Sequence, residues 1–148
     1  MRKIAFLSVV AGILGTAVLA DPLATAVARQ EYYKALGGVM KPMGELAKGF
    51  DAEKAKVQTA LLVAALSKDV LPLYEPGTSD ADLPGKSRAM AKIWDNLEDV
   101  TAKNQAMQEA AKVVVAAAEA GDAAAFAAAF GQLGGTCKSC HDTYRVPE

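Results

Sequence analysis

The run Cys137-Lys138-Ser139-Cys140-His141 constrains this chain more than any other feature, because it holds both of its cysteines and its only histidine. A Cys-x-x-Cys-His run is typical of a site where c-type haem is attached covalently. Each thiol forms a thioether with one haem vinyl group, and the adjacent imidazole becomes the proximal ligand of the iron. On a helix the three side chains share one face, because they are three and four residues apart. The run predicts one covalently bound haem c.

A redox disulfide and half of a zinc site are the alternatives for the same residues. A redox pair of cysteines is usually found near a βαβ pattern, and the sequence contains no such pattern. A structural zinc site needs four ligands in a closed tetrahedral shell. No second Cys/His pair is present to complete that shell. Haem attachment is therefore the favoured interpretation.

The first twenty residues predict a secretory signal peptide, residues 1–20. Arg2 and Lys3 form a short basic start, an apolar run of small residues follows, and Ala-Val-Leu-Ala ends the segment at Ala20. The apolar run is short for a membrane span, although a retained N-terminal anchor is the alternative. Cleavage after Ala20 leaves residues 21–148 as a single domain, expected in the periplasm with no membrane attachment.

Charge and residue usage narrow the possible functions. The formal net charge of −1 becomes −3 when Arg2 and Lys3 leave with the leader. Because this balance is mildly acidic and no basic patch is present, nucleic acid is not an expected partner. A single histidine, with no Ser/His/Asp or paired-carboxylate arrangement, argues against an acid–base enzyme. No disulfide is expected to stabilise the exported domain, so the cofactor is expected to take that role.

Apolar residues recur at steps of three and four along the mature sequence, whereas strand-like alternation is absent. Helices are expected at about residues 22–50, 51–67, 87–120 and 122–144, with a loop rich in Pro, Gly and Asp at about 69–85. Asp51 and Asp122 are expected to cap helix starts, and Gly121 to end the third helix. The pattern predicts an all-α protein, an antiparallel up-down four-helix bundle with haem in its core.

The apolar stripes of the helices indicate which faces pack in the core. On the second helix, Val57 and Leu61 lie in one row, and Leu62 and Leu66 widen the face. The stripe of the last helix consists of Phe126, Phe130, Leu133, Cys137, Cys140 and Tyr144. The haem motif is therefore expected on the core side of the last helix.

The leader, the four helices and the run from Cys137 to Arg145 together resemble cytochrome c′, a class II c-type cytochrome. Class I cytochromes carry the haem motif near the N-terminus, so its late position here is informative. The further matches are Arg29-Gln30 followed by an aromatic residue at position 33, Pro76-Gly77-Thr78, Ile93-Trp94 and residues 133–137. The resemblance covers the whole mature chain.

On the last helix, the resemblance implies that Cys137 and Cys140 form the thioethers and that His141 is the proximal ligand. Arg145 lies where the family keeps a cation beside the proximal histidine. A solvated charge that favours the helix dipole is an equal alternative for Arg145.

Elsewhere the resemblance implies contacts with the edge of the haem. Arg29 and Gln30 match positions that contact the haem propionates, and guanidinium–carboxylate pairing is bidentate and strong. A surface position is the alternative for Arg29. Ser87 and Arg88 match a further contact with the haem edge, although less closely.

The sixth coordination position of the iron decides between functions. A single histidine excludes bis-His ligation within one chain. The candidate methionine ligands are Met40, Met43, Met90 and Met107, although methionines at helical spacing usually fill a core. The family position that faces the iron is Tyr33, which in cytochromes c′ packs over the iron without bonding. Although a phenol can ligate iron, Tyr33 is expected to act as a steric gate above a five-coordinate iron.

An open but crowded iron favours small diatomic ligands, NO above all and CO less readily. The sequence thus predicts a periplasmic monohaem cytochrome that binds NO and CO and transfers single electrons. A low-spin, Met-ligated electron carrier is one alternative, and a haem-free thiol oxidoreductase or structural bundle is another.

The resemblance also implies a homodimer. The candidate contacts are Leu36, Val39, Leu46 and Leu62, although most of these are expected to fill the monomer core. The net charge does not identify a redox partner protein.

Overall fold

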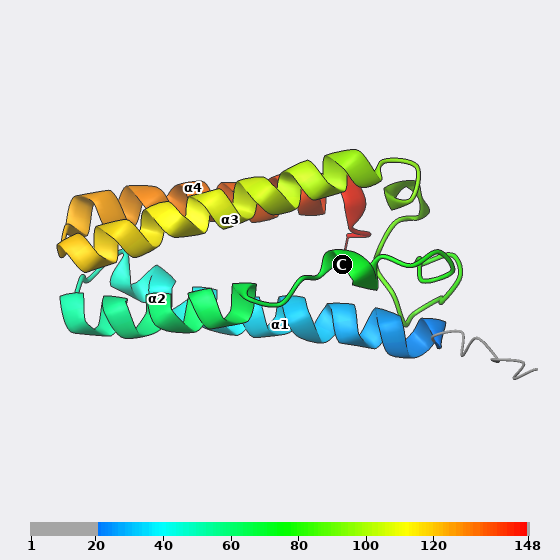
Figure 1. Ribbon diagram of the computed structural model, residues 1–148, viewed down its shortest axis with the longest axis horizontal. Helices are drawn as coiled ribbons and strands as arrows, with labels where there is room; N and C mark the ends of the chain where they lie inside the picture. The colour runs from blue at the N-terminus through cyan, green and yellow to red at the C-terminus, as the bar shows by residue number, and fades with distance from the viewer. Residues whose placement is uncertain (1–20, 148) are drawn as a thin grey trace, which may run out of the picture.

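The computed structural model describes residues 21–147, and the expected signal peptide lies outside them. The described chain forms the helices α1 (Pro22–Leu46), α2 (Ala52–Leu66), α3 (Leu97–Ala120) and α4 (Ala123–Tyr144), with short 3-10 helices η1 (Leu71–Leu73) and η2 (Ala91–Ile93). Consecutive α-helices run in opposite directions, with α1 and α2 below α3 and α4 in Figure 1. The predicted all-α antiparallel bundle is confirmed. Within residues 21–147, no helix combines the length and the hydropathy needed to cross a membrane.

The helix boundaries follow from capping side chains. Asp51 accepts a hydrogen bond from Lys54 N (3.0 Å), and Asp122 accepts one from Ala125 N (2.9 Å), so both start helices as predicted. Gly121 has a φ of 67°, in the left-handed region that glycine occupies at little cost, and it ends α3 as predicted. These local signals account for both ends of the α3–α4 connection.

Three expectations about the elements are wrong. Helix α1 ends at Leu46 and not near Phe50, because the following residues turn and the amides of Lys48 and Gly49 bond to Glu45 O. On α2, the buried face is Ala55, Thr59 and Leu62. Val57 and Leu61 are 59% and 49% exposed. The expected core face is therefore wrong for Val57 and Leu61 but right for Leu62, which is 1% exposed.

The third helix begins at Leu97 and not near Ser87. The residues just after Ser87 pair with a distant part of the chain: Met90 N donates to Tyr144 O (2.9 Å) and Val146 N donates to Arg88 O (2.9 Å). These bonds join the segment before η2 to the C-terminal end of α4. Long-range pairing thus takes the place of the expected first turns of helix.

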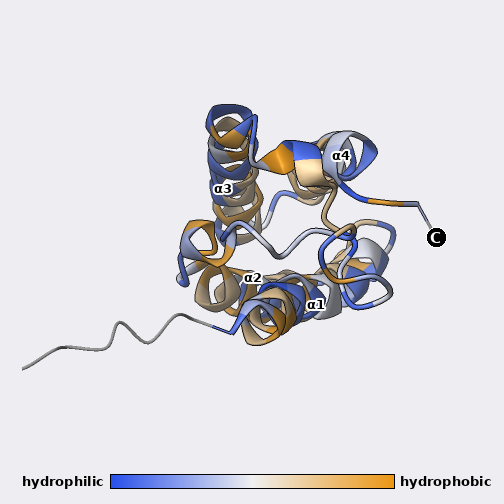
Figure 2. Ribbon diagram, turned by 90° about the vertical axis from the view of Figure 1, so that its right-hand side faces the viewer, coloured by the Kyte–Doolittle hydropathy of each residue, from blue (hydrophilic) through white to orange (hydrophobic). Residues whose placement is uncertain are grey.

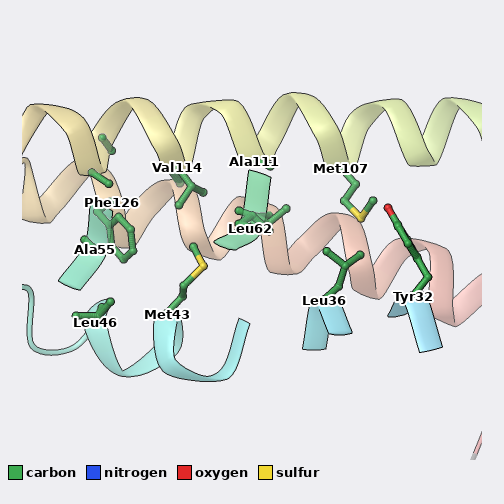
Figure 3. Close-up of a cluster of buried hydrophobic side chains, with 14 of the residues drawn as sticks. Tyr32, Leu36, Met43, Leu46, Ala55, Leu62, Met107, Ala111, Val114 and Phe126 are labelled. Carbon is green, nitrogen blue, oxygen red and sulfur yellow. The ribbon is translucent and has the colours of Figure 1, made fainter. Parts of the chain in front are cut away.

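The main core is a continuous apolar cluster inside the bundle. Its most deeply buried large side chains are Met43, Leu62, Val114, Phe126 and Leu133. Figure 3 shows Phe126, Met43 and Val114 pointing toward one another between the helices. Leu36, Leu46 and Leu62 belong to this cluster and Val39 packs against it, so these dimer candidates serve the monomer core, as expected for most of them.

The two ends of the bundle differ because α2 is short. It has 15 residues against 25 in α1, so the connecting segment (residues 67–96) covers the N-terminal half of α1. Figure 2, viewed from that end, shows the segment between the α1–α2 layer and the α3–α4 layer. A second, smaller cluster of Ile93, Val100 and Tyr144 lies here, with Tyr74, Trp94 and Cys140 packed against it.

Candidate haem site

The C-terminal turns of α4 present the Cys-x-x-Cys-His motif. Cys137 and Cys140 are half-buried free thiols, whereas His141 is exposed. Burial raises the pKa of both thiols, which keeps them protonated at neutral pH. The turn is fixed to α3, because Lys103 Nζ donates to Ser139 Oγ (3.0 Å). The motif therefore lies on α4 beside α3, with its two thiols partly facing the interior.

Two arginines lie near His141. The pKa of His141 is lowered, first by partial burial of the imidazole and then by the positive charges of Arg145 and Arg88. Arg145 follows α4 directly, and its amide donates to His141 O (3.1 Å). The lowered pKa favours the neutral imidazole, which is the form that binds a metal.

Arg29 lies on α1 and is 4% exposed. Its Nη1 donates to Leu73 O (2.8 Å) and to Thr78 Oγ1 (2.8 Å). Its Nη2 donates to Thr78 O (2.7 Å) and to Ser87 Oγ (3.3 Å). The alternative that Arg29 is a surface residue is therefore wrong. Its guanidinium is buried and holds the connecting segment by hydrogen bonds.

The same contacts bear on the expected propionate contact of Arg29. A guanidinium has five N–H donors, and both terminal nitrogens already bond to the connecting segment. A bidentate pair of these nitrogens with a propionate would break those bonds. The contact between Arg29 and a haem propionate stays a prediction. Of the guanidinium nitrogens, Nε is the one that could donate to a propionate without breaking these bonds.

Gln30, Ser87 and Arg88 meet at one groove beside α1. The Gln30 amide donates to Lys86 O, and Arg88 Nη2 donates to Val146 O (2.7 Å). The groove has a volume of about 560 Å³ and is lined by Gln30, Asp80, Pro84, Gly85, Lys86, Ser87, Arg88, Val146 and Pro147. The fold thus brings together three residues that the sequence placed at the haem edge from distant positions.

Tyr33 lies one helical turn after Arg29 and near the motif. Its hydroxyl is 2.8 Å from that of Tyr74, in the connecting segment. Burial raises the pKa of both phenols, and the nearby Cys140 raises them further. Cys140 of α4 therefore lies within electrostatic range of Tyr33 on α1, and it packs against the same small cluster as Tyr74.

Tyr74 is the site residue that the sequence did not reveal. It follows η1, and its ring packs near the smaller cluster beside Cys140. The signal present in the sequence was an aromatic residue between two prolines, Pro72 and Pro76, inside a long loop. Such a loop often has a function, but the pattern does not say which side chain it contributes.

The arrangement fits a covalently bound haem. Helices α3 and α4 pack together along their lengths, whereas α1 and α4 make only slight contact. The two half-buried thiols of α4 are free, and Cys140 lies within electrostatic range of Tyr33 on α1. Among the candidate methionine ligands, Met43 and Met107 lie in the main core, Met40 packs against it and Met90 precedes η2.

Comparisons with known sequences and structures indicate one family. The family model described as cytochrome c′ matches residues 25–145. Cytochrome c′ of Cereibacter sphaeroides is 38% identical over 149 residues, which cover 99% of this chain and 99% of the relative. A solved cytochrome c′ from Rhodobacter sphaeroides has a TM-score of 0.81 and 39% identity, covering 87% of this chain and 100% of that one.

Two further solved structures contain a bound gas. A mutant of cytochrome c′ from Alcaligenes xylosoxidans in complex with nitric oxide has a TM-score of 0.77 and 29% identity, covering 88% of this chain and 99% of that chain. A variant of the same protein with carbon monoxide bound has a TM-score of 0.76 and 30% identity, covering 86% and 98%.

Proposed function

The chain belongs to the cytochrome c′ family and binds haem c, and we propose that it is a periplasmic protein that binds NO and CO at a five-coordinate iron. When bound, haem c supplies an iron atom with affinity for small diatomic gases. The observation that carries the proposal is the half-buried phenol of Tyr33, whose hydroxyl is 2.8 Å from that of Tyr74.

Three residues of α4 would hold the cofactor. The thiols of Cys137 and Cys140 would form the thioethers, and the imidazole of His141 would bind the iron. The depressed pKa of His141 supports this role, because the imidazole is then neutral at physiological pH. Arg145 and Arg88 contribute to that depression through their charges.

Tyr33 would cover the other side of the iron without binding it. A phenol binds iron as a phenolate, but burial raises the pKa of Tyr33 strongly and so disfavours its ionisation. A neutral phenol restricts access by its bulk and leaves a coordination position for a small ligand. The gas complexes of the Alcaligenes relative support NO and CO as those ligands.

The wider setting follows from the sequence and the relatives. Residues 1–20 would direct export, leaving the domain 21–148 in the periplasm as a binding and electron-transfer protein rather than an enzyme. A homodimer is also proposed. A cytochrome c′ described as having ligand-controlled dimer dissociation supports it, with a TM-score of 0.78 and 30% identity.

Haem staining of the denatured protein, followed by visible spectra of both oxidation states with and without NO, tests the proposal. We expect covalent haem, high-spin spectra, and a spectral change when NO is added. The double variant Cys137→Ala/Cys140→Ala is the control, and it should lose all covalent haem. A methionine–iron charge-transfer band that NO leaves unchanged would instead indicate the Met-ligated electron carrier.

A further inference from the structure

The hydroxyl of Tyr33 is held by a residue far away in the chain. Tyr74 lies in the connecting segment, and the two phenol oxygens are 2.8 Å apart, with either able to donate. A tyrosine at the surface of a helix ordinarily has freedom about its χ1 torsion. This hydrogen bond, together with the edge-on packing of the Tyr33 ring against Tyr32 (5.0 Å between centroids), restricts the orientation of the Tyr33 ring.

Tyr74 is itself held from several directions. The guanidinium of Arg29 lies over its ring, 5.1 Å from the centroid, and also binds the carbonyl of the preceding residue, Leu73. The indole Nε1 of Trp94 donates to Tyr74 O (3.2 Å). Because its ring and its backbone are both fixed, Tyr74 is a rigid support for the Tyr33 hydroxyl.

We propose that Tyr74 is a positioning residue that keeps the Tyr33 ring over the gas-binding position and thereby slows the entry of gas. This inference rests on the proposed function, since it concerns access to the same iron. An incoming ligand must displace the Tyr33 ring, and that movement breaks the bond to Tyr74. The connecting segment therefore contributes to ligand discrimination, because a weakly bound gas compensates less well for the broken bond than a strongly bound one.

The hydrogen bond between Tyr33 and Tyr74 is expected to persist across physiological pH. Burial raises the pKa of both phenols, so neither ionises near neutrality and a hydroxyl proton is always available to be shared. The partner of Tyr33 is a neutral group and not a carboxylate, so no titration of a partner acid releases it.

Tyr74→Phe tests the proposal in the haem-loaded protein, because it removes one oxygen and keeps the ring beneath Arg29. Loss of one hydrogen bond predicts CO association about 3- to 10-fold faster than in the wild type. Tyr33→Phe should give a similar increase, and the double variant should add nothing further. Tyr32→Phe is the matched control, since the Tyr32 hydroxyl is buried and makes no hydrogen bond within residues 21–147. It should leave the rate unchanged.

Guanidinium unfolding of the same proteins gives a second readout that does not involve gas. The two substitutions should lower the unfolding midpoint non-additively, because either one breaks the shared bond. Additive shifts, or a Tyr74→Phe rate equal to that of the wild type, would overturn the inference and leave the proposed function standing. A wild-type protein that binds neither NO nor CO would overturn the proposed function, and the positioning role with it.

Discussion

The two halves of this bundle are held together by different forces. In the core half, around Met43, Val114 and Phe126, apolar side chains pack in the interior with almost no exposure. In the site half, around Arg29 and Tyr33, directional hydrogen bonds to the connecting segment fix the positions. Apolar packing tolerates small rearrangements, whereas hydrogen bonds specify orientation. The half that must present groups to a cofactor is the half built from oriented contacts.

The buried charge of Arg29 is the energetic cost of this arrangement. Burial lowers its pKa, although the nearby Tyr74 and Tyr33 oppose that shift. Its hydrogen bonds within residues 21–147 go to carbonyl and hydroxyl oxygens and not to a carboxylate. A buried charge is stable only when such groups satisfy it. The loop is ordered because it supplies them, and in return the charge fixes the loop beside the site.

Phe126→Ala should cause the largest loss of stability, because it creates a cavity in the core half. The ring is fully buried and lies 5.3 Å from that of Phe50, centroid to centroid. We expect the free energy of unfolding to fall by about 3–5 kcal/mol, as measured by guanidinium denaturation. The visible spectrum of the native protein should not change, since the site half is left intact.

Phe130→Ala is the matched control, because this ring is on the same helix and only half-buried. Its cost should be clearly smaller than that of Phe126→Ala. If the two variants lost equal stability, or if Phe126→Ala altered the Soret band, the separation of the two halves would be wrong.

Arg29→Met should act mainly on the site half. It removes the guanidinium donors from Leu73 O and from Thr78 O, although Thr78 O keeps its bond from Ser87 Oγ, for a loss of about 2–3 kcal/mol. Hydrogen exchange should increase in the connecting segment more than in α3 or α4. The visible spectrum should also change, because Tyr74 loses the group above its ring.

Two substitutions serve as controls for Arg29→Met. Arg29→Lys retains the charge but lacks the planar fork that reaches two acceptor groups at once, so it should rescue only part of the effect. Lys34→Met removes a positive charge from an exposed position of the same helix and should change neither readout. Uniform loss of protection throughout the bundle would show that Arg29 acts on global stability alone.

Local signals in the sequence were sufficient for much of the fold. The carboxylates of Asp51 and Asp122 and the left-handed Gly121 each act within a few residues, and the helix ends that they predict are confirmed. The haem motif was readable for the same reason, since its residues are neighbours along one helix. The roles of the individual site residues stay predictions until they are tested.

The prediction that a helix begins at Ser87 is wrong because the structure of the connecting segment depends on distant partners. Ser87 looked like a helix start, yet it bonds to Thr78 O (2.8 Å) and to Arg29, which lies 58 residues away. The role of Tyr74 likewise depends on Tyr33, 41 residues away. No periodicity or capping pattern encodes such pairs, so only the three-dimensional structure reveals them.

The hydrogen bond between Tyr144 and Asp99 should make the stability of the site half depend on alkaline pH, which is a smaller effect. The Tyr144 hydroxyl donates to Asp99 Oδ2 (2.6 Å), and this bond, with burial, raises the pKa of Tyr144 from 10.0 to about 12. The folded state therefore favours the neutral phenol more than the unfolded state does. The resulting stabilisation is fully present below pH 10 and is lost as the pH rises to about 12.

Tyr144→Phe isolates this contribution, because it removes the hydroxyl and leaves the other tyrosines in place. Below pH 10 the wild type should be the more stable protein in guanidinium unfolding, by about 1 kcal/mol for the lost hydrogen bond. The difference should shrink as the pH approaches 12, because an ionised Tyr144 cannot donate to the carboxylate of Asp99 and is repelled by it. A difference that stays constant across this range would mean that Tyr144 stabilises the bundle by packing alone. The smaller cluster near Cys140 would then resemble the core half.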